Sequence, residues 1–156
     1  MSALTFHPPT PARLDYIAER LRAADRVELA VTAPGRAVAE VLHDSVLSSR
    51  WSIVAEVDGV ASIAYGVAPT ADPLIGSPWL LATDDLRKVR REFIERCRGE
   101  VRLMQQKFLV LTNEVHRDNA LSIRWLEWLG FTIDRARPVG PNGEMFVFWK
   151  GNARHV

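Results

Sequence analysis

The sequence predicts an α/β fold, a single domain over residues 1–156 with a mixed central sheet and flanking helices. Two apolar runs, Trp79–Thr83 and Phe108–Val115, have the composition of strands buried on both faces. One long segment between them carries apolar residues at steps of three and four, which is typical of an amphipathic helix. A strand–helix–strand unit of this kind predicts two adjacent parallel strands joined by a right-handed crossover.

The N-terminal part is predicted to contain a short strand, "ALTF", followed by two helices. Thr10 can cap the free amides of the first helix, and Pro11 suits the first helical turn. A second helix is expected from about residue 36 to 47, after a break at "APG". The piece between the helices, "ADRVELAVT", fits neither a helix nor a strand clearly.

Strand signals follow. Residues 51–57 alternate in polarity, and Asp58-Gly59 after them is a strong hairpin signal, so residues 60–69 are the expected return strand. Residues 69–78 are expected to be a loop. Beyond the long helix, predicted over residues 84–106, come a helix from Asn119 to Leu129 that Gly130 ends and a closing hairpin around "GPNG".

Composition limits the classes of function. A net charge of +1 gives no sign of a nucleic-acid partner, and 47% apolar residues exclude a disordered chain. Cys97 is the only cysteine, which fits a reducing compartment and leaves no internal disulfide. No signal peptide, membrane-spanning run or metal-ligand spacing is found, so we expect a cytoplasmic protein without a metal.

The C-terminal segment "NALSIRWLEWLGF" carries the most specific motif. It resembles the GNAT acetyltransferases, which commonly have an Asn, a small residue and Ile, and Gly-Phe after the helix. The matching positions are Asn119, Ser122, Ile123, Gly130 and Phe131. The resemblance covers nearly the whole chain, and it implies transfer of an acetyl group from acetyl-CoA to an amine.

The resemblance also implies where acetyl-CoA would bind. Ligands of such sheets lie beyond the carboxyl ends of the strands, here near Ala82–Thr83 and Val115–His116. Backbone amides near Leu81 and Ala82 would polarise the thioester carbonyl. The expected cofactor-binding residues are Leu81, Ala82, Thr83, Arg87, Lys88, Arg90 and Asn119.

Two positions depart from the family pattern. The glycine-rich turn that cradles the coenzyme A pyrophosphate reads "LATDDLRKVRRE" and contains no glycine. Asp84 and Asp85 stand where a phosphate would arrive, and a carboxylate about 5 Å from a phosphate charge costs on the order of 3 kcal/mol. Leu126 stands where the family has a tyrosine that protonates the departing thiolate, and leucine has no proton to give.

An amine acceptor must lose a proton, so a base or hydrogen-bonding group is needed. Glu28, His116 and Tyr65 are the candidate catalytic residues. Each has an alternative interpretation: a surface carboxylate for Glu28, an exposed loop histidine for His116 and core packing for Tyr65. Asn119 is equally explained as a helix N-cap.

A narrower likeness concerns two segments, "GSPWLLATDDL" and "LTNEVHRDNALSIRWLEWLGFTI". They look similar to GNAT-like proteins of short-tailed phages that are associated with the virion or its assembly. Two functions therefore stay open. One is acyl transfer with weakened cofactor and acid positions, and the other is a non-catalytic role through contacts with phage virion proteins, in the host cytoplasm or the virion.

Overall fold

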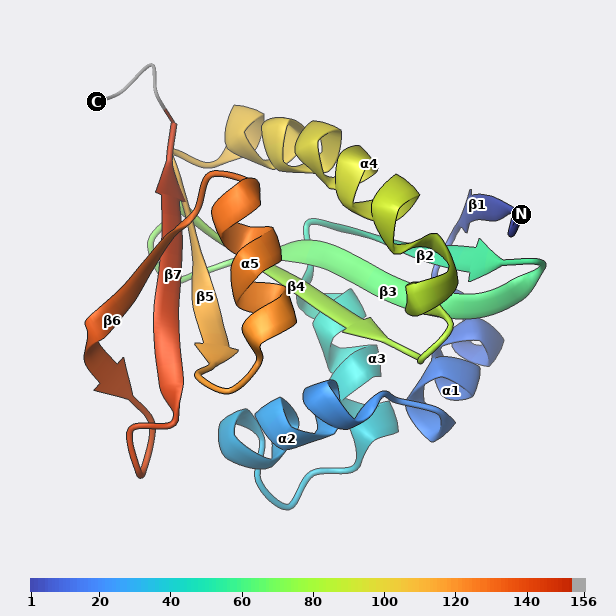
Figure 1. The fold of residues 1–156 in the computed structure, drawn as a ribbon, viewed down its shortest axis with the longest axis horizontal. Coiled ribbons are helices and arrows are strands. Elements are labelled where there is room, and N and C mark those ends of the chain that lie inside the picture. Colours follow the sequence, from blue (N-terminus) through green and yellow to red (C-terminus); the bar gives the residue numbers. More distant parts are fainter. Residues whose placement is uncertain (153–156) are drawn as a thin grey trace. The chain divides into compact units, whose positions relative to one another are not determined.

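The computed structural model describes residues 1–152 and has an α/β fold with one mixed seven-stranded sheet (Figure 1). Its elements in chain order are β1 (Leu4–His7), α1 (Pro11–Glu19), α2 (Ala23–Thr32), α3 (Val38–Ser48), β2 (Trp51–Val57), β3 (Val60–Pro69), β4 (Ile75–Ala82), α4 (Leu86–Lys107), β5 (Val110–His116), α5 (Ala120–Trp128), β6 (Thr132–Val139) and β7 (Met145–Gly151). The strand order is β1-β2-β3-β4-β5-β7-β6. The expected single domain over residues 1–156 stays a prediction, and its last four residues lie outside the described part.

The chain forms two compact units, of which the first comprises residues 1–68 and 79–93. Strands β1, β2 and β3 are antiparallel, and the β2–β3 turn at Asp58-Gly59 has φ values of 51° and 79°. Two successive positive φ angles are what a two-residue hairpin of this twist requires, so the hairpin prediction is confirmed. Thr10 caps α1 by accepting a hydrogen bond from the Arg13 amide, as predicted.

Helix α2 was missed by the sequence pattern, which left its residues ambiguous. The reason is that this helix buries a charged side chain and exposes an apolar one, since Asp25 is 1% exposed and Val27 is 48% exposed. Hydrophobic periodicity assumes that the apolar side chains face the core, and here a carboxylate does so instead. The Arg22 N-cap also makes no side-chain capping bond, so no start signal marks the helix.

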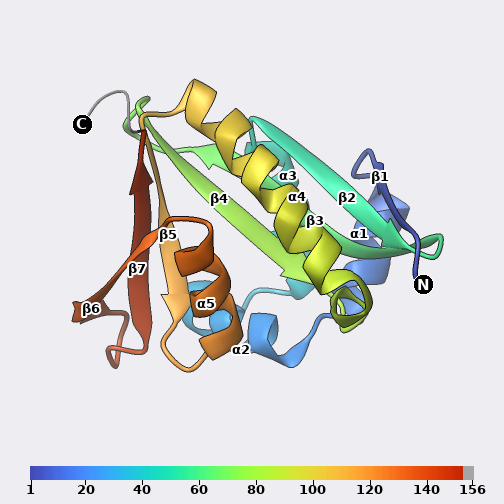
Figure 2. The same cartoon turned by 45° about the horizontal axis from the view of Figure 1, so that its top comes forward.

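The second unit comprises residues 69–78 and the described residues from 94 onward. Strands β5, β7 and β6 are antiparallel, and α5 lies against them in both ribbon views (Figures 1 and 2). The Phe131 and Phe148 rings meet edge to face with centroids 5.2 Å apart. Asn119 caps α5 by accepting a hydrogen bond from the Ser122 amide, which confirms one of the two interpretations of that residue.

Strands β4 and β5 are parallel, as predicted, with Ile75 opposite Val110 and Gly76 opposite Leu111. The prediction of a loop through residue 78 was wrong, because β4 begins at Ile75. Pro78 has no amide to donate, and the side chain of Asn113 donates a hydrogen bond to its carbonyl at 2.8 Å. A hydrogen bond from a distant side chain cannot be seen in a pattern of apolar residues. The segment "IGSP", with its glycine and proline, was therefore predicted as a turn.

Candidate functional site

The end of β4 carries the amide on which the acyl-transfer hypothesis depends. The Ala82 amide donates a hydrogen bond of 2.9 Å to the Asp25 carboxylate, which comes from the first turn of α2. The Ala82 carbonyl accepts a bond of 2.9 Å from the Arg22 amide at the start of the same helix. Both backbone groups of Ala82 are therefore used inside the first unit.

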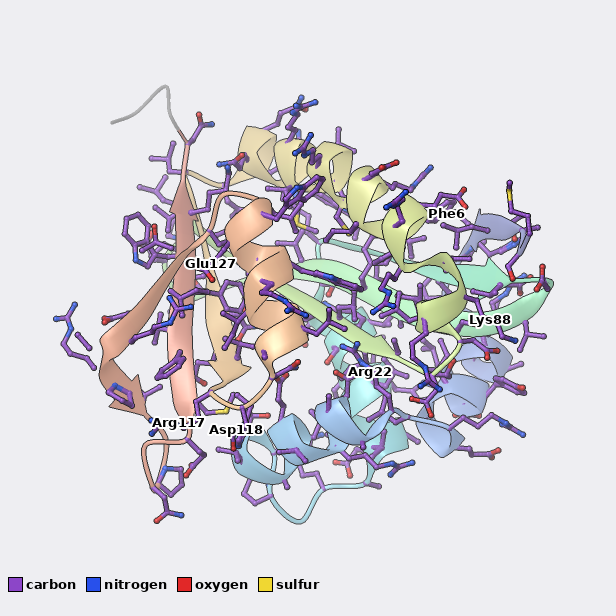
Figure 3. All side chains as sticks on the ribbon, in the orientation of Figure 1. Phe6, Arg22, Lys88, Arg117, Asp118 and Glu127 are labelled. Carbon is purple, nitrogen blue, oxygen red and sulfur yellow. The ribbon has the colours of Figure 1, made fainter. Side chains whose placement is uncertain are left out.

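Arg22 fixes the Asp25 carboxylate with two hydrogen bonds, of 2.7 Å from Nε and 3.0 Å from Nη2. The Asp25 side chain is 2% exposed and that of Arg22 is 14% exposed. A buried carboxylate is tolerated only when its charge is paired and its oxygens accept hydrogen bonds, and here both conditions are met. Figure 3 shows Arg22 at the short turn between α1 and α2.

The backbone amides at the turn from β4 into α4 donate hydrogen bonds to acceptors within the first unit. The Thr83 amide donates to the Ser62 carbonyl at 2.8 Å, and the Thr83 hydroxyl accepts from the Asp85 amide at 3.3 Å. The next amides, at the start of α4, donate to carbonyls three residues back. They belong to Leu86, Arg87 and Lys88, at 3.3, 3.2 and 3.0 Å. A helix start binds anions through free amides, and these amides already have acceptors.

The basic residues expected to meet phosphates lie on the exposed side of this turn. Arg87 donates from Nε to the Asp84 carbonyl at 3.4 Å, and Lys88 pairs with the Asp85 carboxylate at 3.3 Å. Arg90 is exposed. Leu81 points its side chain into the hydrophobic core with Leu14, Ile17 and Leu42, so it offers only backbone groups.

Tyr65 and Glu28 belong to the same unit. Tyr65 is 4% exposed, and its ring meets Phe93 edge to face with centroids 5.6 Å apart, as in core packing. Glu28 is partly exposed on α2, one turn beyond Asp25.

His116 and Asn119 lie in the second unit, at the turn from β5 to α5. The Asp118 amide donates to Nδ1 of His116 at 3.1 Å. An Nδ1 that accepts a hydrogen bond carries no proton, so the neutral ring has its proton on Nε2 and its lone pair in use. This bond opposes a role for His116 as a general base. Asn119 uses its side-chain oxygen for the cap of α5.

Leu126 is only partly buried on α5. Its carbonyl accepts a bond of 2.9 Å from the Phe131 amide, which belongs to the turn that ends the helix at Gly130. The position therefore has space toward solvent, but no proton donor.

Acetyl-CoA does not fit the residues of the β4–α4 turn in this conformation. Its thioester carbonyl and pyrophosphate need free amides, and the amides of Ala82, Thr83, Asp85 and Leu86 are bonded within the first unit. Within residues 1–152, no cluster of three metal-ligating side chains occurs. No helix there is both long and apolar enough to cross a membrane.

Sequence reasoning missed Arg22 and Asp25, a buried charged pair of this region. A signal did exist, since an Arg and an Asp three residues apart directly after a helix can pair on the next helix. It was hidden because the segment itself had no clear secondary structure. Nothing in the sequence indicates that the carboxylate contacts an amide 57 residues away.

Comparison with known proteins identifies the fold. The structure resembles that of yncA from Salmonella typhimurium, solved with its cofactor acetyl-CoA, with 18% identity, a TM-score of 0.65 and 96% and 94% of the two chains covered. It resembles AAC(6')-Ib in complex with ribostamycin and coenzyme A, with 16% identity, a TM-score of 0.68 and the same coverage. A GNAT-family acetyltransferase from Streptococcus pneumoniae matches with 13% identity, a TM-score of 0.57 and 96% and 99% coverage. No protein-family model and no curated protein sequence matches the chain. The chain thus has the GNAT acetyltransferase fold.

Proposed function

We propose that this chain is a non-catalytic GNAT-fold protein that acts through protein contacts, in the virion of a short-tailed phage or its assembly. The observation that carries the proposal is the hydrogen bond from the Ala82 amide to the buried Asp25 carboxylate. A carboxylate on this amide takes the place of the acyl carbonyl oxygen. It also puts a negative charge where an oxyanion would have to form, which opposes acyl transfer.

Three further features support the proposal. The helix-start amides are engaged, Asp84 and Asp85 repel a phosphate, and Leu126 cannot protonate a thiolate. For a contact role, Trp128 and Trp149 are each 46% exposed, and exposed aromatic side chains are enriched at protein interfaces. The phage setting rests on the resemblance of residues 76–86 and 111–133.

The second candidate is acyl transfer from acetyl-CoA to an amine. It is favoured by the structural neighbours, of which one was solved with acetyl-CoA and another with an aminoglycoside and coenzyme A. In that case Glu28, His116 and Tyr65 would assist the acceptor. Arg87, Lys88, Arg90 and Asn119, with the backbone of residues 81–83, would hold the cofactor.

Calorimetric titration of acetyl-CoA into the protein separates the two. We expect a dissociation constant no tighter than about 100 µM, because charge repulsion and occupied amides remove most of the phosphate contacts. A parallel assay of thiol release with a panel of amines should stay at background. Low-micromolar binding together with turnover would instead support the acyltransferase.

An Asp25→Ala variant, shown to be folded by circular dichroism, tests whether the Asp25 carboxylate causes the weak binding of acetyl-CoA. If the Asp25 carboxylate is what blocks the amide, this variant should bind acetyl-CoA more tightly than the unmodified protein. Asp44→Ala is the matched control, since it removes an exposed carboxylate whose one partner within residues 1–152 is Arg36. Equal affinities in all three proteins would show that the Asp25 bond is not the obstacle.

A further inference from the structure

A small basic hollow lies in the second unit, and none of the residues that line it is a candidate for acyl transfer. It has a volume of about 130 Å³. Its lining comes from the second half of α4, the end of α5 and β7, and consists of Arg98, Val101, Arg102, Gln105, Leu129 and Lys150. We refer to these six residues as the basic hollow.

Within the described part of the chain, the cations of the basic hollow form no ion pair. Among residues 1–152, neither Arg98 nor Arg102 forms an ion pair, and no carboxylate lines the hollow. The acids of α4, α5 and β6 that do form pairs hold other arginines: Glu100 pairs with Arg96, Glu127 with Arg135 and Asp134 with Arg137. Glu95, one turn before Arg98 on α4, is exposed and forms no ion pair in this part of the chain.

Arg98 is held in place by stacking, and its guanidinium donates no hydrogen bond to residues 1–152. Its guanidinium lies over the ring of Trp128, with Cζ 3.7 Å from the ring centroid. A stacked guanidinium is fixed by its faces, so the N–H groups along its edge stay available to a ligand. Arg102 follows one turn later on the same face of α4, where two like charges four residues apart repel each other.

Lys150 contributes the third cation from β7. Its ammonium group donates one hydrogen bond, to the Leu129 carbonyl at 3.2 Å, which leaves two of its three protons for other acceptors. Gln105 is anchored by a bond from Nε2 to the Gly151 carbonyl at 3.1 Å, and the same nitrogen has a second proton. The hollow thus gathers donors from α4 and β7, and within residues 1–152 no carboxylate lines it.

We propose that the basic hollow binds a single phosphate group, either as the free ion or as a monoester on a larger ligand. Three positive charges match a dianion better than a singly charged carboxylate, and guanidinium groups match the paired oxygens of a phosphate. The volume suits one such group, since whole small-molecule ligands need roughly 300 Å³ or more. This inference does not depend on the proposed function.

Calorimetric titration of sodium phosphate at constant ionic strength tests the proposal. We expect saturable one-site binding with a dissociation constant of about 1 mM or tighter. Arg102→Gln, at an exposed position, should weaken it about tenfold or more, since charge-assisted bonds are lost. Arg91→Gln, three turns earlier on α4, is the matched control and should leave binding unchanged.

Two further arms sharpen the test. Trp128→Leu keeps every cation but removes the ring on which the Arg98 guanidinium stacks, so it should weaken phosphate binding severalfold. Trp149→Leu is the control, because Trp149 is equally exposed, and it should leave phosphate binding unchanged. Tighter binding of phenyl phosphate than of inorganic phosphate would identify a monoester as the ligand, and the reverse would identify the free ion. Absence of saturable binding, or equal binding by Arg102→Gln and the unmodified protein, would overturn the proposal.

Discussion

The side chain of Lys150 lies against Gly130, and its ammonium group reaches the C-terminal end of α5. Gly130 has a φ of +94°, and a Cβ placed there would lie 2.5 Å from Nζ of Lys150. The ammonium group bonds the Leu129 carbonyl at 3.2 Å, where the partial negative charge of the helix end favours a cation. The positive φ therefore favours a glycine at this position, and a larger residue would also move the flexible end of Lys150.

Gly130→Ala should lower the free energy of unfolding by about 1–3 kcal/mol, because a left-handed backbone angle is strained for alanine and the new methyl group displaces Lys150. Urea denaturation followed by circular dichroism measures the change. Gly99→Ala is the control, since Gly99 is inside α4 and a methyl group added there would meet nothing within 4 Å. That substitution should raise the free energy of unfolding by about 0.5–1 kcal/mol. A lower free energy of unfolding in both variants would contradict the special role of the Gly130 backbone angle.

Asp25→Ala should lower the free energy of unfolding by about 3–5 kcal/mol. It leaves the Arg22 guanidinium poorly paired and the Ala82 amide without an acceptor in the interior. Asp25→Asn should lower the free energy of unfolding by less, because its side-chain oxygen can still accept the hydrogen bond from the Ala82 amide. Thermal and urea unfolding of both variants check the order, and an equal loss in the two would mean that the amide bond contributes little.

Leu126→Tyr should leave the free energy of unfolding within about 1 kcal/mol, since the side chain is partly exposed and a hydroxyl there can reach water. We expect no acetyl transfer by this variant, because the Ala82 amide stays bonded to Asp25. A thiol-release assay with acetyl-CoA and amines measures turnover. A clear gain in rate would show that the acid was the one missing part of a working site.

Cys97 should react slowly with thiol reagents at pH 8. Burial raises the pKa of its thiol to about 12, and Glu100 adds to the rise while Arg96 opposes it. The nucleophilic thiolate is therefore scarce in the folded protein. Labelling with a disulfide reagent in buffer and in urea compares the folded and unfolded thiol.

The same shift has a consequence for stability. Between pH 9 and 12 the unfolded chain loses this proton and the folded chain keeps it, so the free energy of unfolding falls as the pH rises through that window. Well below pH 9 both states keep the proton, and the group contributes no pH dependence. Cys97→Ala should remove this part of the alkaline slope, and an unchanged slope would assign it to other groups.

Elements with local signals were predicted well from the sequence. The Asp58-Gly59 hairpin, the Thr10 cap and the parallel pairing of β4 with β5 follow from turn chemistry, capping and apolar runs. Helix α2 and the start of β4 were not found, because each depends on a contact distant in sequence. Asp25 meets Ala82, and Asn113 meets Pro78.

The candidate site was harder to predict for a related reason. The sequence places Leu81, Ala82 and Thr83 at the expected strand end, and it shows the missing glycines and the missing tyrosine. Whether a backbone amide is free depends on its acceptor in space. Only the structure supplies that information, for Ala82 through Asp25 and for Thr83 through Ser62.

The buried Arg22–Asp25 pair also bears on how this chain can change over generations. Opening the Ala82 amide requires loss of the Asp25 carboxylate, and either partner left alone in the interior costs about 3–5 kcal/mol. A domain has only about 5–15 kcal/mol of net stability, so a single such substitution brings the chain close to unfolding. Arg22 and Asp25 would have to be replaced together to avoid that intermediate. Under the proposed non-catalytic function, this pair would make a change to acyl transfer by single substitutions costly.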